Sequence, residues 1–206
     1  MPTSRARRNW GDDRALLNDE EARDRLLDAA ERCVARRGDT QIRMSEVADA
    51  ANVVRSTVYR YYPSRDDLLL GLVLRRVDRA CTRWIRELRR PQDAAASIRE
   101  LVLLPAASVD SGDPVNLALY AGESTGLATV LEAGAQSVTE IVAGNLKPLF
   151  KAWKDEGQIY PDLDLNETVQ WMSATSSFLL TPTWRHRSPA AKRRFVDRYL
   201  LRALIR

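Results

Sequence analysis

The chain has 206 residues, and 45% of them are hydrophobic, enough for a real core in one large domain or two small ones. Its net charge of +4 is unevenly spread: residues 1–90 hold 20 arginines and 15 acids, whereas residues 91–206 hold 12 basic and 13 acidic side chains. A polar N-terminus and the lack of any apolar run near the required ~20 residues exclude a signal peptide and a membrane span, so we expect a cytoplasmic protein.

The N-terminal segment, residues 1–19, shows no helical periodicity and is expected to be a disordered basic arm. Its arginines Arg5, Arg7 and Arg8 either follow a DNA backbone or are simply solvated. From Glu20 to Arg37 the apolar residues recur at helical spacing, and the following glycine is typical of a helix C-terminus. This helix is expected to form the core on which the next segment rests.

Apolar residues between Met44 and Ala51 fall on one face and predict a short helix. Asn52 interrupts this pattern, and asparagine is one of the few residues that tolerate a left-handed backbone. A second helix is expected from about Arg55 until Pro63, because the residue before a proline is pushed out of the helical region. The segment therefore predicts two helices joined by a tight turn.

The outward face of the second helix is basic and aromatic. It carries Arg55, Ser56, Tyr59 and Arg60, opposite the buried side formed by Val58 and Tyr62. Arginine binds guanine through two hydrogen bonds, and hydroxyl groups bind phosphate oxygens, so this face suits DNA. The pattern indicates a helix-turn-helix, with an ordinary amphipathic helical hairpin as the alternative.

The stretch VADAANVVRSTVYRYYPSRDDLL resembles the signature of the TetR family of bacterial repressors, and the resemblance covers about residues 22–70. Two residues depart from the family pattern. Asn52 replaces the usual glycine of the turn, and Val54 replaces the serine that usually caps the recognition helix. Without that cap, either the helix begins a residue later or its first amides await a DNA phosphate.

The resemblance implies an all-α protein. The expected domains are an N-terminal three-helix DNA-binding domain at residues 20–64 and a larger ligand-binding and dimerisation domain at residues 65–206. The implied partners are double-stranded operator DNA, a small-molecule effector and a second copy of the chain. The expected DNA-contacting residues, on and around the recognition helix, are Arg43, Arg55, Ser56, Thr57, Tyr59, Arg60, Tyr61 and Arg65.

Six further helices are expected beyond the DNA-binding domain. Ser64 is a suitable cap for the first of them, which links the two domains and so can act as a lever. The six run over residues 65–90, 92–109, 115–121, 129–156, 166–181 and 188–205.

The last two of these helices are apolar around most of their circumference, so they must be buried on several sides. A two-fold four-helix interface supplies those sides; burial inside a single monomer is the alternative. The expected interface residues are Trp171, Phe195, Tyr199 and Leu200.

The effector pocket implied by the resemblance should lie among the C-terminal helices. Candidates for its wall are the aromatic residues of otherwise apolar helices, each of which can also be plain core: Trp84, Tyr120, Trp153, Trp171 and Phe178. The shortage of charged residues facing inward indicates a mainly apolar ligand.

No catalytic or metal-binding constellation is evident. The single histidine, His186, lies between two arginines in an expected loop, and Cys33 and Cys81 are isolated from each other. We therefore expect a protein without cofactor, metal or enzymatic activity, acting as a ligand-responsive transcriptional repressor. The alternatives are a helical small-molecule-binding or enzymatic domain without DNA binding, and a DNA-binding activator or nucleoid protein without a ligand.

Overall fold

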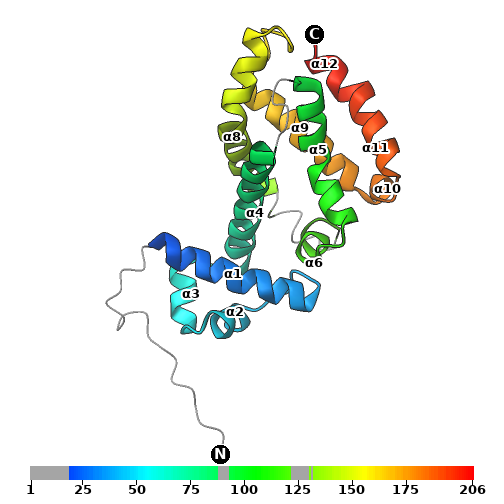
Figure 1. Ribbon diagram of the computed structural model, residues 1–206. Helices are drawn as coiled ribbons and strands as arrows, with labels where there is room; N and C mark the ends of the chain where they lie inside the picture. Colours follow the sequence, from blue (N-terminus) through cyan, green and yellow to red (C-terminus); the bar gives the residue numbers. More distant parts are fainter. Residues whose placement is uncertain (1–18, 88–92, 122–129, 131) are drawn as a thin grey trace, which may run out of the picture.

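The computed structural model describes residues 19–87, 93–121, 130 and 132–206, and in these residues the chain is all-α, as predicted (Figure 1). Pairing of the β type is limited, within these ranges, to an isolated bridge between Ile159 and Ile205. The predicted basic arm lies outside the described residues except for Asp19. In the described part of the chain, no helix is long and apolar enough to cross a membrane.

Three helices form the N-terminal part: α1 (Asp19–Arg37), α2 (Met44–Ala51) and α3 (Arg55–Tyr61). α1 starts with acidic side chains and ends with arginines, which complements the helix dipole. Gly38 terminates α1 in the left-handed conformation, with φ at 75°, as the sequence predicted. α2 and α4 pack against α1, so α1 provides the central support of this part.

The tight turn between α2 and α3 depends on Asn52. Its φ of 57° and ψ of 45° place it in the left-handed region, which confirms the prediction. The amide of the next residue, Val53, donates to the carbonyl of Ala48 at 3.0 Å, and Val53 is fully buried. The turn is therefore closed by backbone bonds and anchored by a valine.

The long helix α4 (Arg65–Glu87) is shared by two hydrophobic cores. The Ser64 hydroxyl caps it by accepting from the Asp67 amide at 3.1 Å, as predicted. Leu68 and Leu72 near its start belong to the N-terminal core, whereas Cys81 and Trp84 belong to the C-terminal core. α4 is thus a continuous rigid connection between the two cores.

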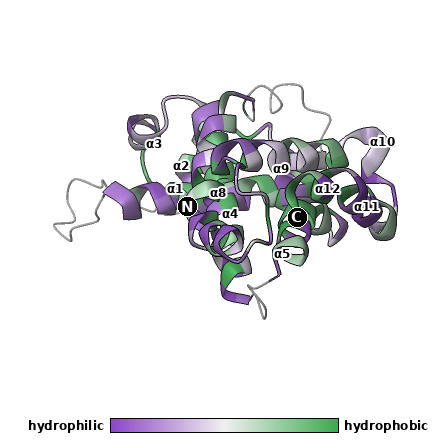
Figure 2. Cartoon of the chain, turned by 90° about the horizontal axis from the view of Figure 1, so that it is seen from above, coloured by the Kyte–Doolittle hydropathy of each residue, from purple (hydrophilic) through white to green (hydrophobic). Residues whose placement is uncertain are grey.

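The C-terminal part surrounds the far half of α4 with further helices (Figure 1). They are α5 (Ala94–Asp110), α6 (Pro114–Asn116) continued by the π-helix η1 (Leu117–Ala121), α8 (Ala135–Asp155), α9 (Leu165–Leu180), α10 (Pro182–Arg185) and α11 (Pro189–Phe195), the last continued by the π-helix η2 (Val196–Leu201) and by α12 (Arg202–Leu204). Seen from above, hydrophobic segments gather around α8 and α9, whereas α1 carries hydrophilic turns at its outer end (Figure 2).

The structure differs from the sequence prediction where one helix was expected over residues 129–156. A turn at Gly134 precedes α8, which begins at Ala135. A Cβ at Gly134 would lie 2.2 Å from Cδ1 of Leu70 and 3.3 Å from the carbonyl oxygen of Val130. A side chain at this position would therefore require the Leu70 side chain to move.

The end of the chain also differs from the prediction in detail. α10 was not predicted, and the final helix is not regular α-helix, because its middle is the π-helix η2. Its predicted start is confirmed: the Ser188 hydroxyl accepts from the Ala191 amide at 3.3 Å, and Pro189 follows. Lys192, 2% exposed, forms an ion pair with Asp110 at 3.0 Å and joins α11 to α5.

Candidate nucleic-acid interface and ligand pocket

The N-terminus of α3 has no side-chain cap. Val54 occupies the cap position with an extended backbone, and the helix begins at Arg55. The Thr57 amide donates to the Val54 carbonyl at 3.0 Å, so one backbone bond closes the first turn. The helix therefore forms in spite of the missing serine.

The outward face of α3 has the composition that the sequence predicted. Arg55, Ser56, Tyr59 and Arg60 are exposed, whereas Val58 and Tyr62 are buried. Arg55 donates through Nη2 to the Tyr59 hydroxyl at 2.8 Å, and its guanidinium carbon lies 5.2 Å from the ring centre. α3 itself contains no acidic residue. Guanidinium and hydroxyl groups are thus presented together on one short exposed helix.

Tyr61 does not lie on this face. It is 8% exposed, and its hydroxyl donates to Oδ1 of Asp19 at 2.9 Å and accepts from Arg60. The ring packs within the N-terminal core, while Thr57 is half-buried. The predicted DNA contact of Tyr61 thus has little surface available, because helical spacing turns its side chain toward α1.

The two flanking arginines differ in how their side chains are held. Arg43 is exposed at the start of α2, where its own amide donates to Glu46 at 2.9 Å. Arg65 is half-buried; it donates to the Gln41 side chain at 2.8 Å and pairs with Asp66 at 2.9 Å. Arg43 is thus the more accessible of the two.

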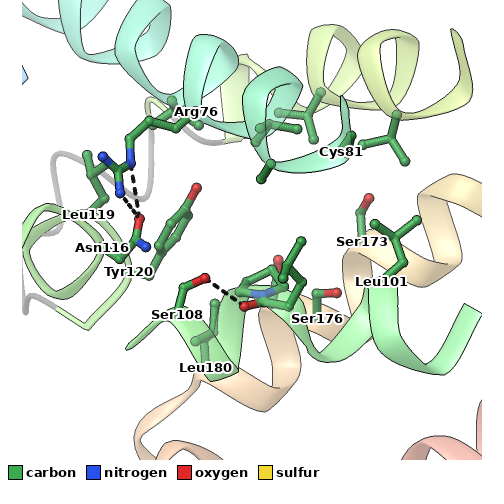
Figure 3. A pocket seen from close by; sticks show the side chains of 18 of the residues that line it. Arg76, Cys81, Leu101, Ser108, Asn116, Leu119, Tyr120, Ser173, Ser176 and Leu180 are labelled. Carbon is green, nitrogen blue, oxygen red and sulfur yellow. Dashed lines mark hydrogen bonds between the residues drawn. The ribbon is translucent and has the colours of Figure 1, made fainter. Parts of the chain in front are cut away.

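A cavity of about 700 Å³ lies in the C-terminal part, between α4, α5, α8 and α9, with η1 at one end (Figure 3). Its apolar wall includes Val77, Leu101, Val142 and Leu180. The volume is in the range of small-molecule sites. Val73 and Leu119 line the cavity and also belong to the N-terminal core, so the cavity adjoins the support of the helix-turn-helix.

Of the five aromatic residues predicted to line the pocket, only Tyr120 does so (Figure 3). Trp84 and Trp153 are buried in the C-terminal core, and Trp171 and Phe178 are exposed on the surface. These four residues therefore do not line this cavity, because an aromatic residue on an apolar helix fills a core or an outer face equally well.

Sequence reasoning missed the polar residues of the cavity wall. α9 contributes Ser173, Ser176 and Ser177, and α4 contributes Arg76, Arg79 and Arg83. A signal for the serines was present in the sequence: on an apolar helix they recur at the three- and four-residue spacing of one face. The Ser176 hydroxyl donates to the Val102 carbonyl at 2.8 Å, so it is satisfied within the wall.

Arg76 connects the cavity to the N-terminal part. It pairs with Glu31 of α1, pairs with Asp113 at 3.0 Å and donates to the Asn116 side chain at 3.0 Å. Asp113 also caps α6 by accepting from the Asn116 amide at 2.8 Å. Burial disfavours its charge, but that amide and the Arg76 guanidinium hold the pKa of Asp113 below its usual range. One guanidinium thus joins α1, α4 and α6.

The reactive groups near the cavity are poorly suited to catalysis. Burial, with the nearby charge of Asp78, raises the pKa of Cys81 to about 11, and burial also raises the pKa of Tyr120. Both groups are therefore protonated at neutral pH. His186 is exposed at the end of α10. Within the described ranges, no three His, Cys, Asp or Glu residues are grouped to hold a metal ion.

An aromatic patch lies on the outer side of α9 and the final helix. Phe178 stacks on Phe195 with ring centres 5.3 Å apart, and Tyr199 follows at 4.9 Å from Phe195. Trp171, Phe178 and Tyr199 are 50%, 42% and 58% exposed. The prediction that Leu200 belongs to this surface was wrong: Leu200 is 1% exposed within the C-terminal core.

Residues 26–72 match the family described as bacterial regulatory proteins, tetR family. An uncharacterized HTH-type transcriptional regulator of Mycobacterium tuberculosis (strain H37Rv) is 47% identical over 60 residues, which are 29% of this chain and 30% of that protein. The HTH-type transcriptional repressor KstR of Rhodococcus jostii is 35% identical over 72 residues, 35% of this chain and 34% of KstR. The chain thus spans about a third of the length of these curated relatives.

Among solved structures, Salmonella enterica GusR is similar with a TM-score of 0.58 at 20% identity, over 91% of this chain and 98% of that one. At this level of identity the similarity concerns the fold. It extends over both the N-terminal and the C-terminal helices, whereas the sequence relatives match about a third of the chain.

Proposed function

We propose that this chain is a TetR family transcriptional regulator, a homodimeric repressor that binds palindromic operator DNA and is released by a small ligand. The observation that carries the proposal is the exposed face of α3, which presents Arg55, Tyr59 and Arg60. The other side of α3 packs into the N-terminal hydrophobic core. That face has the donors that base edges and phosphates accept.

The homodimer is supported by the aromatic patch. Three large exposed aromatic residues on adjoining elements are unusual for a surface that stays in water, and aromatic residues are enriched at interfaces. A two-fold axis through α9 and the final helix would pair the patch with its own copy. Two copies of α3 would then be available for successive major grooves, about 34 Å apart.

Release by a ligand is supported by the position of the cavity. A molecule in it would touch Val73 and Leu119, which belong to the N-terminal core, and Arg76, which is bonded to Glu31 of α1. A ligand that fits better when these groups move would shift the population toward a state with a different spacing of the two α3 helices. Such a state cannot place both helices on one operator.

Selection of bound sequences from a random DNA pool tests the proposal. The full-length protein should enrich a palindrome with two half-sites, and the same selection with Tyr59→Ala should enrich that palindrome much more weakly. An unpaired half-site would contradict the dimeric reading. If no sequence is enriched and the protein shows no salt-dependent retention on DNA, the result would favour a helical ligand-binding or enzymatic domain without DNA binding.

A further inference from the structure

The cavity has an excess of positive charge at its opening. Its charged wall residues are Glu31, Arg76, Arg79, Arg83 and Asp113. Arg76 is bonded to both of the acids, and Glu31 also pairs with Arg75, so these two guanidinium groups balance the two carboxylates. The excess therefore comes from Arg79 and Arg83.

Arg79 and Arg83 are both exposed while they line the cavity, which places them where it opens to water. No carboxylate of the described residues forms an ion pair with either guanidinium. The adjacent acid on α4, Asp78, instead accepts from the Asn145 side chain at 3.0 Å. The two arginines are also one helical turn apart, a spacing at which like charges repel each other. An anion between them would relieve this repulsion.

Most of the interior of the cavity is apolar. Val77, Leu101, Leu104, Val138 and Met172 contribute hydrocarbon surface to it. The Ser108 hydroxyl donates to the Leu104 carbonyl at 2.8 Å, and the Ser176 hydroxyl is bonded in the same way to Val102. These two hydroxyl donors are therefore already used within α5 and α9 and call for no polar partner in the interior.

We propose that the ligand is an amphiphile with an anionic head group, a carboxylate or a phosphate, which Arg79 and Arg83 hold at the opening. Its apolar chain lies in the interior between α4, α5 and α9. Guanidinium groups form bidentate, charge-assisted hydrogen bonds with both kinds of head group. The inference rests on the proposed function only in naming this molecule as the effector; the binding itself does not require DNA.

Calorimetric titration of the full-length protein with dodecanoate, dodecyl phosphate and dodecanol tests this proposal. Each of the two anions should bind with one molecule per chain, and the neutral alcohol should bind at least about tenfold more weakly. The double variant Arg79→Gln/Arg83→Gln should lose about tenfold or more in affinity for the anions and keep its affinity for dodecanol. Tighter binding of one anion would support the proposal and identify the head group.

The matched control is Arg86→Gln, which removes an exposed arginine of α4 that does not line the cavity. This variant should bind the anions as the unchanged protein does. Equal binding of dodecanol and dodecanoate, no binding of any of the three, or an unaltered double variant would each overturn the proposal. DNA binding measured without ligand is a separate readout, so failure of this inference is distinguishable from failure of the proposed function.

Discussion

Arg55 and Tyr59 hold each other on the surface of α3 through a hydrogen bond of 2.8 Å and a cation–π contact. Each side chain thereby loses part of its rotamer freedom in the free protein. A pair that is already ordered has less entropy to lose when it contacts DNA. The exposed face is therefore partly preorganised for binding.

We predict that Arg55→Ala and Tyr59→Ala each weaken binding to the selected operator by about 1–3 kcal/mol, the usual cost of a lost base contact. Their thermal midpoints should stay close to that of the unchanged protein, because both side chains are exposed. Gel-shift titration and thermal denaturation give the two quantities. A midpoint that falls clearly with either substitution would show that the face is structural.

Tyr61→Phe is the matched control on the same helix. It removes the hydroxyl that bonds to Asp19 and should lower the free energy of unfolding by about 1 kcal/mol. Operator affinity should change little. A loss of affinity comparable to that of Tyr59→Ala would return Tyr61 to the DNA-contacting set.

The outward face of α3 could be predicted from the sequence because Val58 and Tyr62 fix the buried side at four-residue spacing. The role of Leu200 could not, because η2 is a π-helix whose wider turn alters which positions share a face. Arg79 and Arg83 were also beyond prediction. Only the assembled cavity distinguishes them from other solvated arginines of α4.

At the scale of elements, the helical layout was largely predictable, since glycine, proline and capping residues mark most boundaries. Gly38, Asn52 and Ser64 end or start helices as expected. The turn at Gly134 was not predicted; Gly134 lies against Leu70, which is distant in sequence and close in space. Contacts of this kind carry no local pattern.

Glu31 ties α1 to α4 through two ion pairs. It pairs with Arg75 at 3.0 Å and with Arg76, whose side chains are 9% and 18% exposed. Glu31→Gln should lower the free energy of unfolding by about 1–3 kcal/mol, less than for a fully buried pair, because the Glu31 side chain is itself 26% exposed. Urea denaturation measures the loss.

Asp28→Asn provides the comparison for Glu31→Gln. Asp28 also pairs with Arg75, at 2.8 Å, but its side chain is 50% exposed. We expect a change within about 0.5 kcal/mol, as for surface ion pairs. Equal losses for the two variants would mean that the bridge to Arg76 adds nothing to stability.

At the scale of the whole molecule, substitutions at the neighbouring residues Tyr199 and Leu200 should have different effects, because Tyr199 is exposed in the aromatic patch and Leu200 is buried. Tyr199→Glu replaces an exposed aromatic side chain with a charged one. It should dissociate the proposed dimer while each chain stays folded. Operator affinity should fall with it, although α3 is unchanged. Light scattering and an operator titration give the two results.

Leu200→Arg should instead unfold the chain, because a charge would enter the C-terminal core. Leu117→Glu, at another exposed apolar residue, on η1, is the control and should remain dimeric. A Tyr199→Glu protein with the molecular mass of a dimer would place the interface elsewhere.

The sharing of α4 between two cores restricts how the DNA-reading part can be exchanged between related regulators. A chimera joined before Arg65 would keep Leu68 and Leu72 from one parent beneath an α1 helix from the other, and two surfaces that never coevolved would have to pack. A junction beyond Val73 keeps that contact within one parent. Val115 and Leu119 also reach this core from the α6 and η1 segment, so a working graft has to carry that second, distant segment as well.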